Sequence, residues 1–226
     1  EKYPNILFES CAGGGGRFDP GMLYYAPQTW TSDDTDAVER LKIQYGHSMV
    51  YPLKSIGSHV STIPTHQVGR MTPMETRANV AYFGTFGYEL DITQLSDEDK
   101  EKVKHQVRFF KQYRELIHNG DFYRLLSPFS SNTTAWMVVS EDKLEAIVGY
   151  YQVLAKPNEK FQRLKLEGLD PDKAYQINGS ETTHYGDELM NIGIVLNENY
   201  RNIKEGKNRH KHKRDYDSKL FVIKAV

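Results

Sequence analysis

Residues 28–51 read QTWTSDDTDAVERLKIQYGHSMVY, and this stretch contains the signals that decide the fold. A short run with strand character, residues 28–32, ends at a cluster of acids, and apolar residues then recur at roughly helical spacing from Val38 to Tyr45. Thr35 or Asp36 can cap the first turn of that helix. The stretch predicts a strand, a polar loop and a helix in that order, which is the unit from which parallel α/β sheets are built.

The same unit recurs on both sides of this stretch. Further short strands are predicted at residues 6–10, after Ser55 and at residues 86–92, and further helices from Pro73 and over residues 96–120. We count four strand–helix units, which is half of a (β/α)₈ barrel of about 250 residues. Because half a barrel has unpaired parallel edges, we expect the other half to lie upstream of Glu1.

The character of the sequence changes after Gly120. Runs rich in β-branched and aromatic residues, such as TTAWMVV and SKLFVIKAV, alternate with turn sequences. This pattern predicts an antiparallel β-sandwich. The fold class is therefore α/β plus all-β, with a partial TIM-barrel catalytic domain at residues 1–120 and an antiparallel β-domain at residues 121–226.

Composition excludes some classes of partner. The chain has 29 Lys and Arg against 30 Asp and Glu, and this balance favours neither nucleic acid nor an anionic membrane surface. No apolar run approaches the roughly 20 residues that span a bilayer. A single cysteine cannot form an internal disulfide, which fits a reducing compartment. We expect a cytoplasmic protein whose partner is a small molecule.

Candidate site residues follow the first two predicted strands. Cys11 precedes the glycine run 13–16, which lacks the Lys and Ser or Thr of a phosphate-binding loop. Asp33, Asp34 and Asp36 follow the next strand, at the edge where barrel enzymes hold their active sites. Asp34 and Asp36 could instead only cap the helix that follows.

Asp33 is the acid nearest the strand end, and Trp30 is close to it in sequence. A carboxylic acid shielded by an indole would hold its proton more tightly and could act as a general acid. Glycoside hydrolysis needs such an acid and a second carboxylate, about 5–5.5 Å apart in retaining enzymes. No second carboxylate is evident in the right place.

The histidines give weaker signals. His59 and His66 follow the third predicted strand on the same edge, where either could contact substrate or serve only as a structural hydrogen-bonding group. His210 and His212 lie in the basic stretch NRHKHKRDYD without a third ligand nearby, so no metal site is predicted there.

Three longer stretches carry a family resemblance: FESCAGGGGRFDPGMLYYAPQTWTSDDTDAVERLKIQYG from residue 8, GSHVSTIPTHQVGRMTPMETRANVAYFGTFGYELD from residue 57, and GDELMNIGI from residue 186. They resemble the C-terminal part of bacterial α-galactosidases of glycoside hydrolase family 36. The resemblance implies retaining hydrolysis of terminal α-linked galactose in melibiose- or raffinose-type sugars, with no metal or organic cofactor. Full-length members are often oligomers.

The resemblance also implies residue roles. Asp33 corresponds to the acid/base, Cys11 and Gly14 to groups that contact galactose hydroxyls, and Trp30 to a residue lining the pocket. The family's nucleophile is an aspartate in a lysine-tryptophan-aspartate segment, and no such segment occurs in the 226 residues. We therefore expect the isolated chain to be inactive. The alternative is a non-catalytic carbohydrate-binding or assembly fragment.

Overall fold

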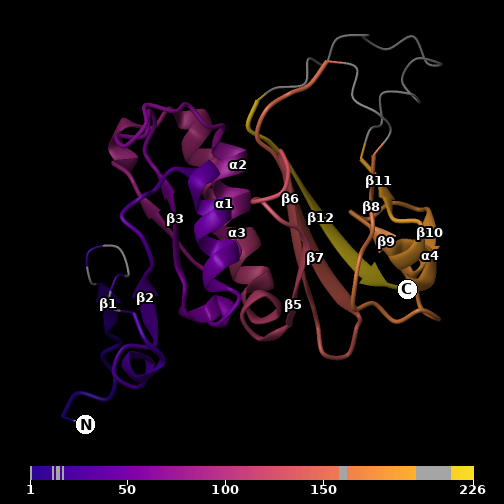
Figure 1. Cartoon of the computed structure of the whole chain (residues 1–226), viewed down its shortest axis with the longest axis horizontal. Helices are drawn as coiled ribbons and strands as arrows, with labels where there is room; N and C mark the ends of the chain where they lie inside the picture. Colours follow the sequence, from indigo (N-terminus) through magenta and orange to yellow (C-terminus); the bar gives the residue numbers. More distant parts are fainter. Residues whose placement is uncertain (1, 12, 14–15, 17, 158–161, 197–214) are drawn as a thin grey trace. The chain divides into compact units, whose positions relative to one another are not determined.

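The computed structural model describes residues 2–11, 13, 16, 18–157, 162–196 and 215–226. The chain forms two compact units, residues 1–119 and 120–226 (Figure 1). Unit 1 contains β1 (Glu9–Cys11), η1 (Pro20–Tyr24), β2 (Gln28–Trp30), α1 (Ala37–His47), η2 (Leu53–Ser55), β3 (Gly57–Ser61), α2 (Met74–Ala81), β4 (Thr85–Glu89), η3 (Ile92–Gln94) and α3 (Asp97–Asn119).

The strands of unit 1 are parallel, as the strand–helix pattern predicts. β1 pairs with β2, and β3 pairs with β4. A single parallel bridge between Thr29 and Ile56 connects the two pairs, so the four strands follow one another in chain order. Helices α1 and α2 contact each other, and α2 also packs against β3 (Figure 1). The carboxyl ends of all four strands therefore point the same way.

The first predicted strand–helix unit is wrong in two respects. First, β1 begins only at Glu9. Ile6, Leu7 and Phe8, which the prediction placed in the strand, lie before it and are exposed. The described residues between β1 and β2 form the 3₁₀ helix η1 and no α-helix. Asp19 begins η1 by accepting hydrogen bonds from the backbone N–H groups of Gly21 and Met22. The glycines and Pro20 disfavour a longer helix here.

The helix signals of unit 1 are borne out. Asp36 accepts hydrogen bonds from the backbone N–H groups of Val38 and Glu39 at the start of α1. The Ser96 hydroxyl accepts from the N–H of Asp99 at 3.1 Å at the start of α3. Phe110 and Ile117 lie on the buried face of α3. Ser, Thr and Asp side chains of this kind satisfy amide groups that a helix start leaves without partners.

Unit 2 is built on antiparallel strands, as predicted. Its elements are β5 (Asp121–Leu126), β6 (Thr133–Val139), β7 (Glu145–Gln152), β8 (Arg163–Leu164), β9 (Ala174–Ile177), β10 (Thr183–Tyr185), α4 (Gly186–Asn191), β11 (Ile194–Val195) and β12 (Asp217–Ala225). Six strands form one sheet in the order β10-β9-β12-β7-β6-β5, and β8 pairs with β11 separately.

Alternating residues of this sheet form the core of unit 2. On β6 and β7, Met137 and Val148 belong to a buried cluster that also contains Leu164 of β8, Leu189 of α4 and Ile194 of β11. One face of the six-stranded sheet thus packs against the small β8–β11 pair and α4. Strand alternation and this second layer fit a β-sandwich.

Candidate functional site

Strand register brings the two predicted site segments together in unit 1. Cys11, the last residue of β1, is the register partner of Trp30, the last residue of β2. Asp33 follows Trp30 by three residues. The Cys11 side chain and the Asp33 side chain are both exposed. Gly14 lies outside the described residues. The predicted site residues that can be located therefore lie at one edge of the parallel strands.

The aspartates after β2 have different roles. Asp36 is fully buried and caps α1. Asp34 accepts a hydrogen bond from the N–H of Asp36 at 3.0 Å, and its own N–H donates to the Ser32 hydroxyl at 3.1 Å. In the part of the chain that the structure describes, we find no hydrogen bond to the Asp33 carboxylate. The capping alternative thus holds for Asp36, and Asp33 presents an uncommitted carboxylate.

The expected shielding of Asp33 by an indole is absent among the described residues. The Asp33 side chain is exposed, whereas Trp30 is 9% exposed and packs elsewhere. The indole stacks on the imidazole of His59, with ring centroids 4.5 Å apart and planes at 23°. The Arg40 guanidinium lies 5.0 Å from the centroid of the same indole. Trp30 is therefore part of the packing beneath the strand edge as well as a neighbour of Cys11.

Arg40 is a buried cation that sequence reasoning missed. It is 2% exposed, and its guanidinium donates to the backbone carbonyl of Gly57 and, at 3.5 Å, to that of Ser32. It thereby ties the end of β2 to the start of β3. Burial lowers the pKa of Arg40 to about 10, against the opposing charges of Asp34 and Glu89. One sequence signal was available. Arg40 falls on the apolar face of α1, where a charged side chain is unusual.

His59 lies on β3 between the indole and an acid. Its Nδ1 is 3.6 Å from a carboxylate oxygen of Glu89, the last residue of β4. That distance exceeds a hydrogen bond, and the Nδ1 atom is buried without one. Burial lowers the pKa of His59, and the nearby Glu89 and Glu9 oppose that shift. His59 thus packs its imidazole ring against the indole of Trp30.

The loop after β3, residues 62–73, folds back onto the acids. The Arg70 guanidinium pairs with the Asp36 carboxylate, and the Thr65 hydroxyl donates to the same carboxylate at 3.3 Å. Gln67 donates from Nε2 to the backbone carbonyl of Asp33 at 2.5 Å. His66, which sequence analysis placed on this edge, contacts Gln67 and is exposed. Gln67 and Arg70 carried no recognisable sequence signal.

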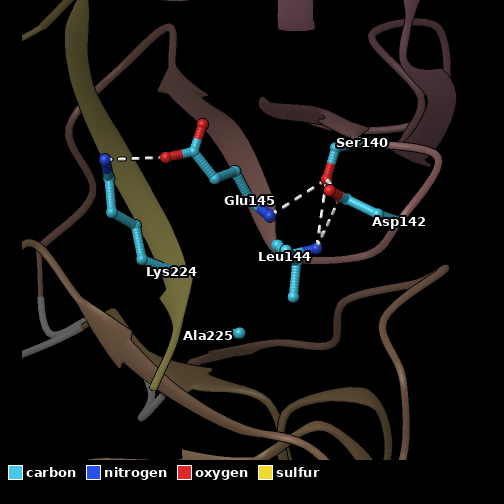
Figure 2. Close-up of a pocket in the computed structure, with 6 residues that line it drawn as sticks. All are labelled: Ser140, Asp142, Leu144, Glu145, Lys224 and Ala225. Atoms are coloured by element: carbon cyan, nitrogen blue, oxygen red, sulfur yellow. Dashed lines mark hydrogen bonds and ion pairs between the residues drawn. The ribbon is translucent and has the colours of Figure 1, made fainter.

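A pocket of about 300 Å³ lies in unit 2, at the turn between β6 and β7 (Figure 2). Its lining residues are Ser140, Asp142, Leu144, Glu145, Lys224 and Ala225. The polar groups bond to one another: Ser140 donates to Asp142 at 2.6 Å, and Lys224 pairs with Glu145 at 2.7 Å (Figure 2). The lining has no aromatic ring for a sugar to stack on. We assign this pocket no role in the site.

Neither a metal-binding cluster nor a membrane-spanning helix occurs among the described residues. No group of three or more His, Cys, Asp or Glu side chains there is arranged to hold a metal ion. His210 and His212 lie outside the described residues. Within the described ranges, every helix is too short or too polar to cross a membrane.

Comparison with known proteins identifies the family. Residues 1–120 match the family model described as Melibiase, and residues 133–223 match the Glycosyl hydrolase family 36 C-terminal domain. The chain belongs to glycoside hydrolase family 36. The sequence resemblance is thereby confirmed, on both units.

Relatives in family 36 are similar over most of this chain. Alpha-galactosidase AgaA of Geobacillus stearothermophilus is 58% identical over 195 residues, which is 86% of this chain and 27% of AgaA. Alpha-galactosidase Mel36A of Lactobacillus acidophilus is 47% identical over 225 residues, 100% of this chain and 29% of Mel36A. The chain thus spans less than a third of the length of these enzymes.

Solved family 36 structures have the same fold. A crystal structure of an AgaA variant in complex with raffinose superposes with a TM-score of 0.91 and 52% identity, covering 100% of this chain and 29% of that one. The α-galactosidase of Lactobacillus brevis gives a TM-score of 0.92 and 50% identity, with coverage of 100% and 30%. Another AgaA variant structure contains stachyose.

Proposed function

We propose that this chain is the acid/base-bearing part of an α-galactosidase that hydrolyses terminal α-linked galactose from raffinose- and melibiose-type sugars. Family membership is the observation that carries the proposal. Unit 1 would supply strands five to eight of the catalytic barrel, and unit 2 the C-terminal β-domain. The parallel order of β1 to β4 and their common direction support the barrel assignment.

Asp33 is the residue that we propose as general acid and base. It would protonate the glycosidic oxygen as the galactosyl group moves to the nucleophile, and then remove a proton from the water that hydrolyses the intermediate. Its carboxylate is exposed and uncommitted, whereas those of Asp34 and Asp36 bond to the backbone. Only an uncommitted carboxylate can exchange its proton without breaking a structural bond.

The remaining sugar contacts would come from the neighbouring strand end. We propose that the Cys11 thiol and the Gly14 backbone amide bind galactose hydroxyls and that Trp30 lines the pocket. The register pairing of Cys11 with Trp30 supports this placement. The nucleophilic aspartate would come from outside the 226 residues, because the sequence contains no lysine-tryptophan-aspartate segment.

A hybrid enzyme tests the proposal. The full chain is fused behind the N-terminal portion of Geobacillus AgaA, in place of the AgaA segment that it matches; the high TM-score makes the exchange conservative. We expect this hybrid enzyme to hydrolyse raffinose and the Asp33→Asn variant to lose about 10²–10⁴-fold of kcat. Asp97→Asn, on the exposed surface of α3, is the matched control. A folded hybrid enzyme without activity counts against the proposal.

The isolated chain distinguishes the alternative function. Without the nucleophile we expect no sustained hydrolysis of an aryl α-galactoside by the purified chain. A non-catalytic carbohydrate-binding fragment would instead bind galactose on its own, with an affinity that Asp33→Asn hardly changes. Calorimetric titration of the chain and its Asp33→Asn variant with galactose separates the two functions.

A further inference from the structure

We propose that Gln67 is a positioning residue for Asp33, and that the loop of residues 62–73 carries it for that purpose. The inference rests on the proposed role of Asp33 as acid/base. Gln67 comes from the loop after β3, while Asp33 comes from the loop after β2, so the contact joins two neighbouring strand ends. The side-chain amide bonds the backbone of Asp33 itself, at 2.5 Å.

Donor and acceptor chemistry fixes the orientation of the Gln67 amide. A backbone carbonyl can only accept, so the nitrogen Nε2 must face Asp33. The same Nε2 lies 3.0 Å from Nε2 of His66. Since an amide NH₂ has two donors and no acceptor, that ring nitrogen of His66 must accept. Both amide protons of Gln67 are then used, one toward Asp33 and one toward the adjacent ring.

The loop is anchored independently of this contact. Arg70 pairs with the fully buried Asp36 carboxylate, and Thr65 donates to that carboxylate at 3.3 Å. Within the loop, the N–H of Thr65 donates to the carbonyl of Arg70 at 3.0 Å, and the N–H of Gly69 donates to the carbonyl of Thr65 at 2.7 Å. Gln67 therefore projects from a closed turn whose two ends are held at the helix cap.

The chemistry predicts which step should depend on Gln67. Fixing the backbone of Asp33 fixes the direction from which its carboxyl group meets the glycosidic oxygen. Protonation of that oxygen matters for a sugar leaving group, which is a poor one, and hardly matters for dinitrophenolate, which leaves without a proton. Loss of Gln67 should thus affect raffinose and spare a dinitrophenyl α-galactoside.

The experiment uses the hybrid enzyme and compares Gln67→Met with Val68→Ala. Methionine keeps the length of the side chain and removes both donors, and Val68 is a 52% exposed neighbour in the same loop. We expect Gln67→Met to lower kcat/KM for raffinose about tenfold and that for the dinitrophenyl galactoside less than about twofold. Val68→Ala should change neither. Equal losses on both substrates would overturn the proposal, because they indicate a general structural role.

A second readout does not need turnover. Amide hydrogen exchange of residues 33–35 in the hybrid enzyme should accelerate in Gln67→Met and stay unchanged in Val68→Ala. Unchanged exchange in Gln67→Met overturns the positioning role. This inference alone is refuted if Asp33→Asn abolishes activity of the hybrid enzyme but Gln67→Met changes kcat/KM equally for raffinose and for the dinitrophenyl galactoside. A folded but inactive hybrid enzyme refutes the proposed function and the inference with it.

Discussion

Asp36 offers the sharpest test of how the site is built, because one buried carboxylate holds two elements. It accepts from the N–H groups of Val38 and Glu39 at 3.0 and 3.1 Å, which begins α1. It also pairs with Arg70 and accepts from Thr65, which anchors the loop of residues 62–73. Asp36→Asn keeps a cap oxygen and removes the charge, whereas Asp36→Ala removes both.

The two contributions can be estimated from these contacts. Loss of an Asp cap costs about 1 kcal/mol. Removing one partner of a buried ion pair costs about 3–5 kcal/mol. Because the Arg70 side chain is 22% exposed and can regain water, we take about 2 kcal/mol for its pair with Asp36. We therefore expect about 3 kcal/mol for Asp36→Ala and about 2 kcal/mol for Asp36→Asn.

Amide hydrogen exchange in the hybrid enzyme measures both effects locally. A decrease of about 3 kcal/mol in the free energy of local opening makes amide exchange on the order of 100-fold faster. We expect this acceleration in the first turn of α1 and in residues 62–70. Asp97→Asn removes a fully exposed carboxylate and should leave these amides unchanged. If Asp36→Asn accelerates exchange as much as Asp36→Ala does, the cap contributes nothing. If Arg70→Met has no effect, the ion pair does not anchor the loop.

Three further predictions concern unit 1 and unit 2. Burial lowers the pKa of His59 below its ordinary 6.5, so the unfolded chain binds the proton more readily than the folded chain. Unit 1 should therefore lose stability as pH falls below about 6.5. His59→Phe should flatten this pH dependence, measured by thermal unfolding. Gly186→Ala should strongly destabilise unit 2, since a Cβ would lie 2.0 Å from the Asp170 carbonyl oxygen, whereas Gly46→Ala in α1 meets open space and should stabilise by about 0.5–1 kcal/mol in urea unfolding. Trp30→Ala removes the surface on which His59 stacks, so it should lower kcat/KM of the hybrid enzyme for raffinose and also accelerate exchange in β3, while a purely sugar-binding role would leave exchange unchanged.

Much of the fold could be predicted from local signals. The strand–helix alternation predicted the parallel strands of unit 1, and the Asp36 and Ser96 caps fall where capping chemistry places them. Prediction was wrong at the start of unit 1, where an apolar run beginning at Ile6 was interpreted as a strand. Ile6 is exposed, and strand pairing begins only at Glu9. Hydrophobic character alone does not provide a pairing partner.

The candidate site was only partly predictable, because its supporting residues act across distances in sequence. Asp33 and Cys11 stand at strand ends, which a one-dimensional pattern can find. Arg40 and Gln67 contact the backbone carbonyls of residues 17 and 34 positions away. Side-chain bonds to backbone carbonyls have no sequence signature, since every residue offers the same acceptor. Such residues become visible only in three dimensions.

The structure holds the backbone around Asp33 while leaving its carboxylate uncommitted. Arg40 donates to the carbonyl of Ser32, Gln67 to that of Asp33, and the Ser61 hydroxyl to that of Thr35 at 2.8 Å. An acid that must both give and take a proton needs a fixed position and a free carboxylate, and these bonds supply the first without using the second. The Asp33 side chain is exposed in the part of the chain that the structure describes, so in the proposed function the substrate and the rest of the enzyme would exclude water from it. In the proposed function, this chain therefore positions the acid that transfers the proton, and the substrate and the rest of the enzyme exclude water from it.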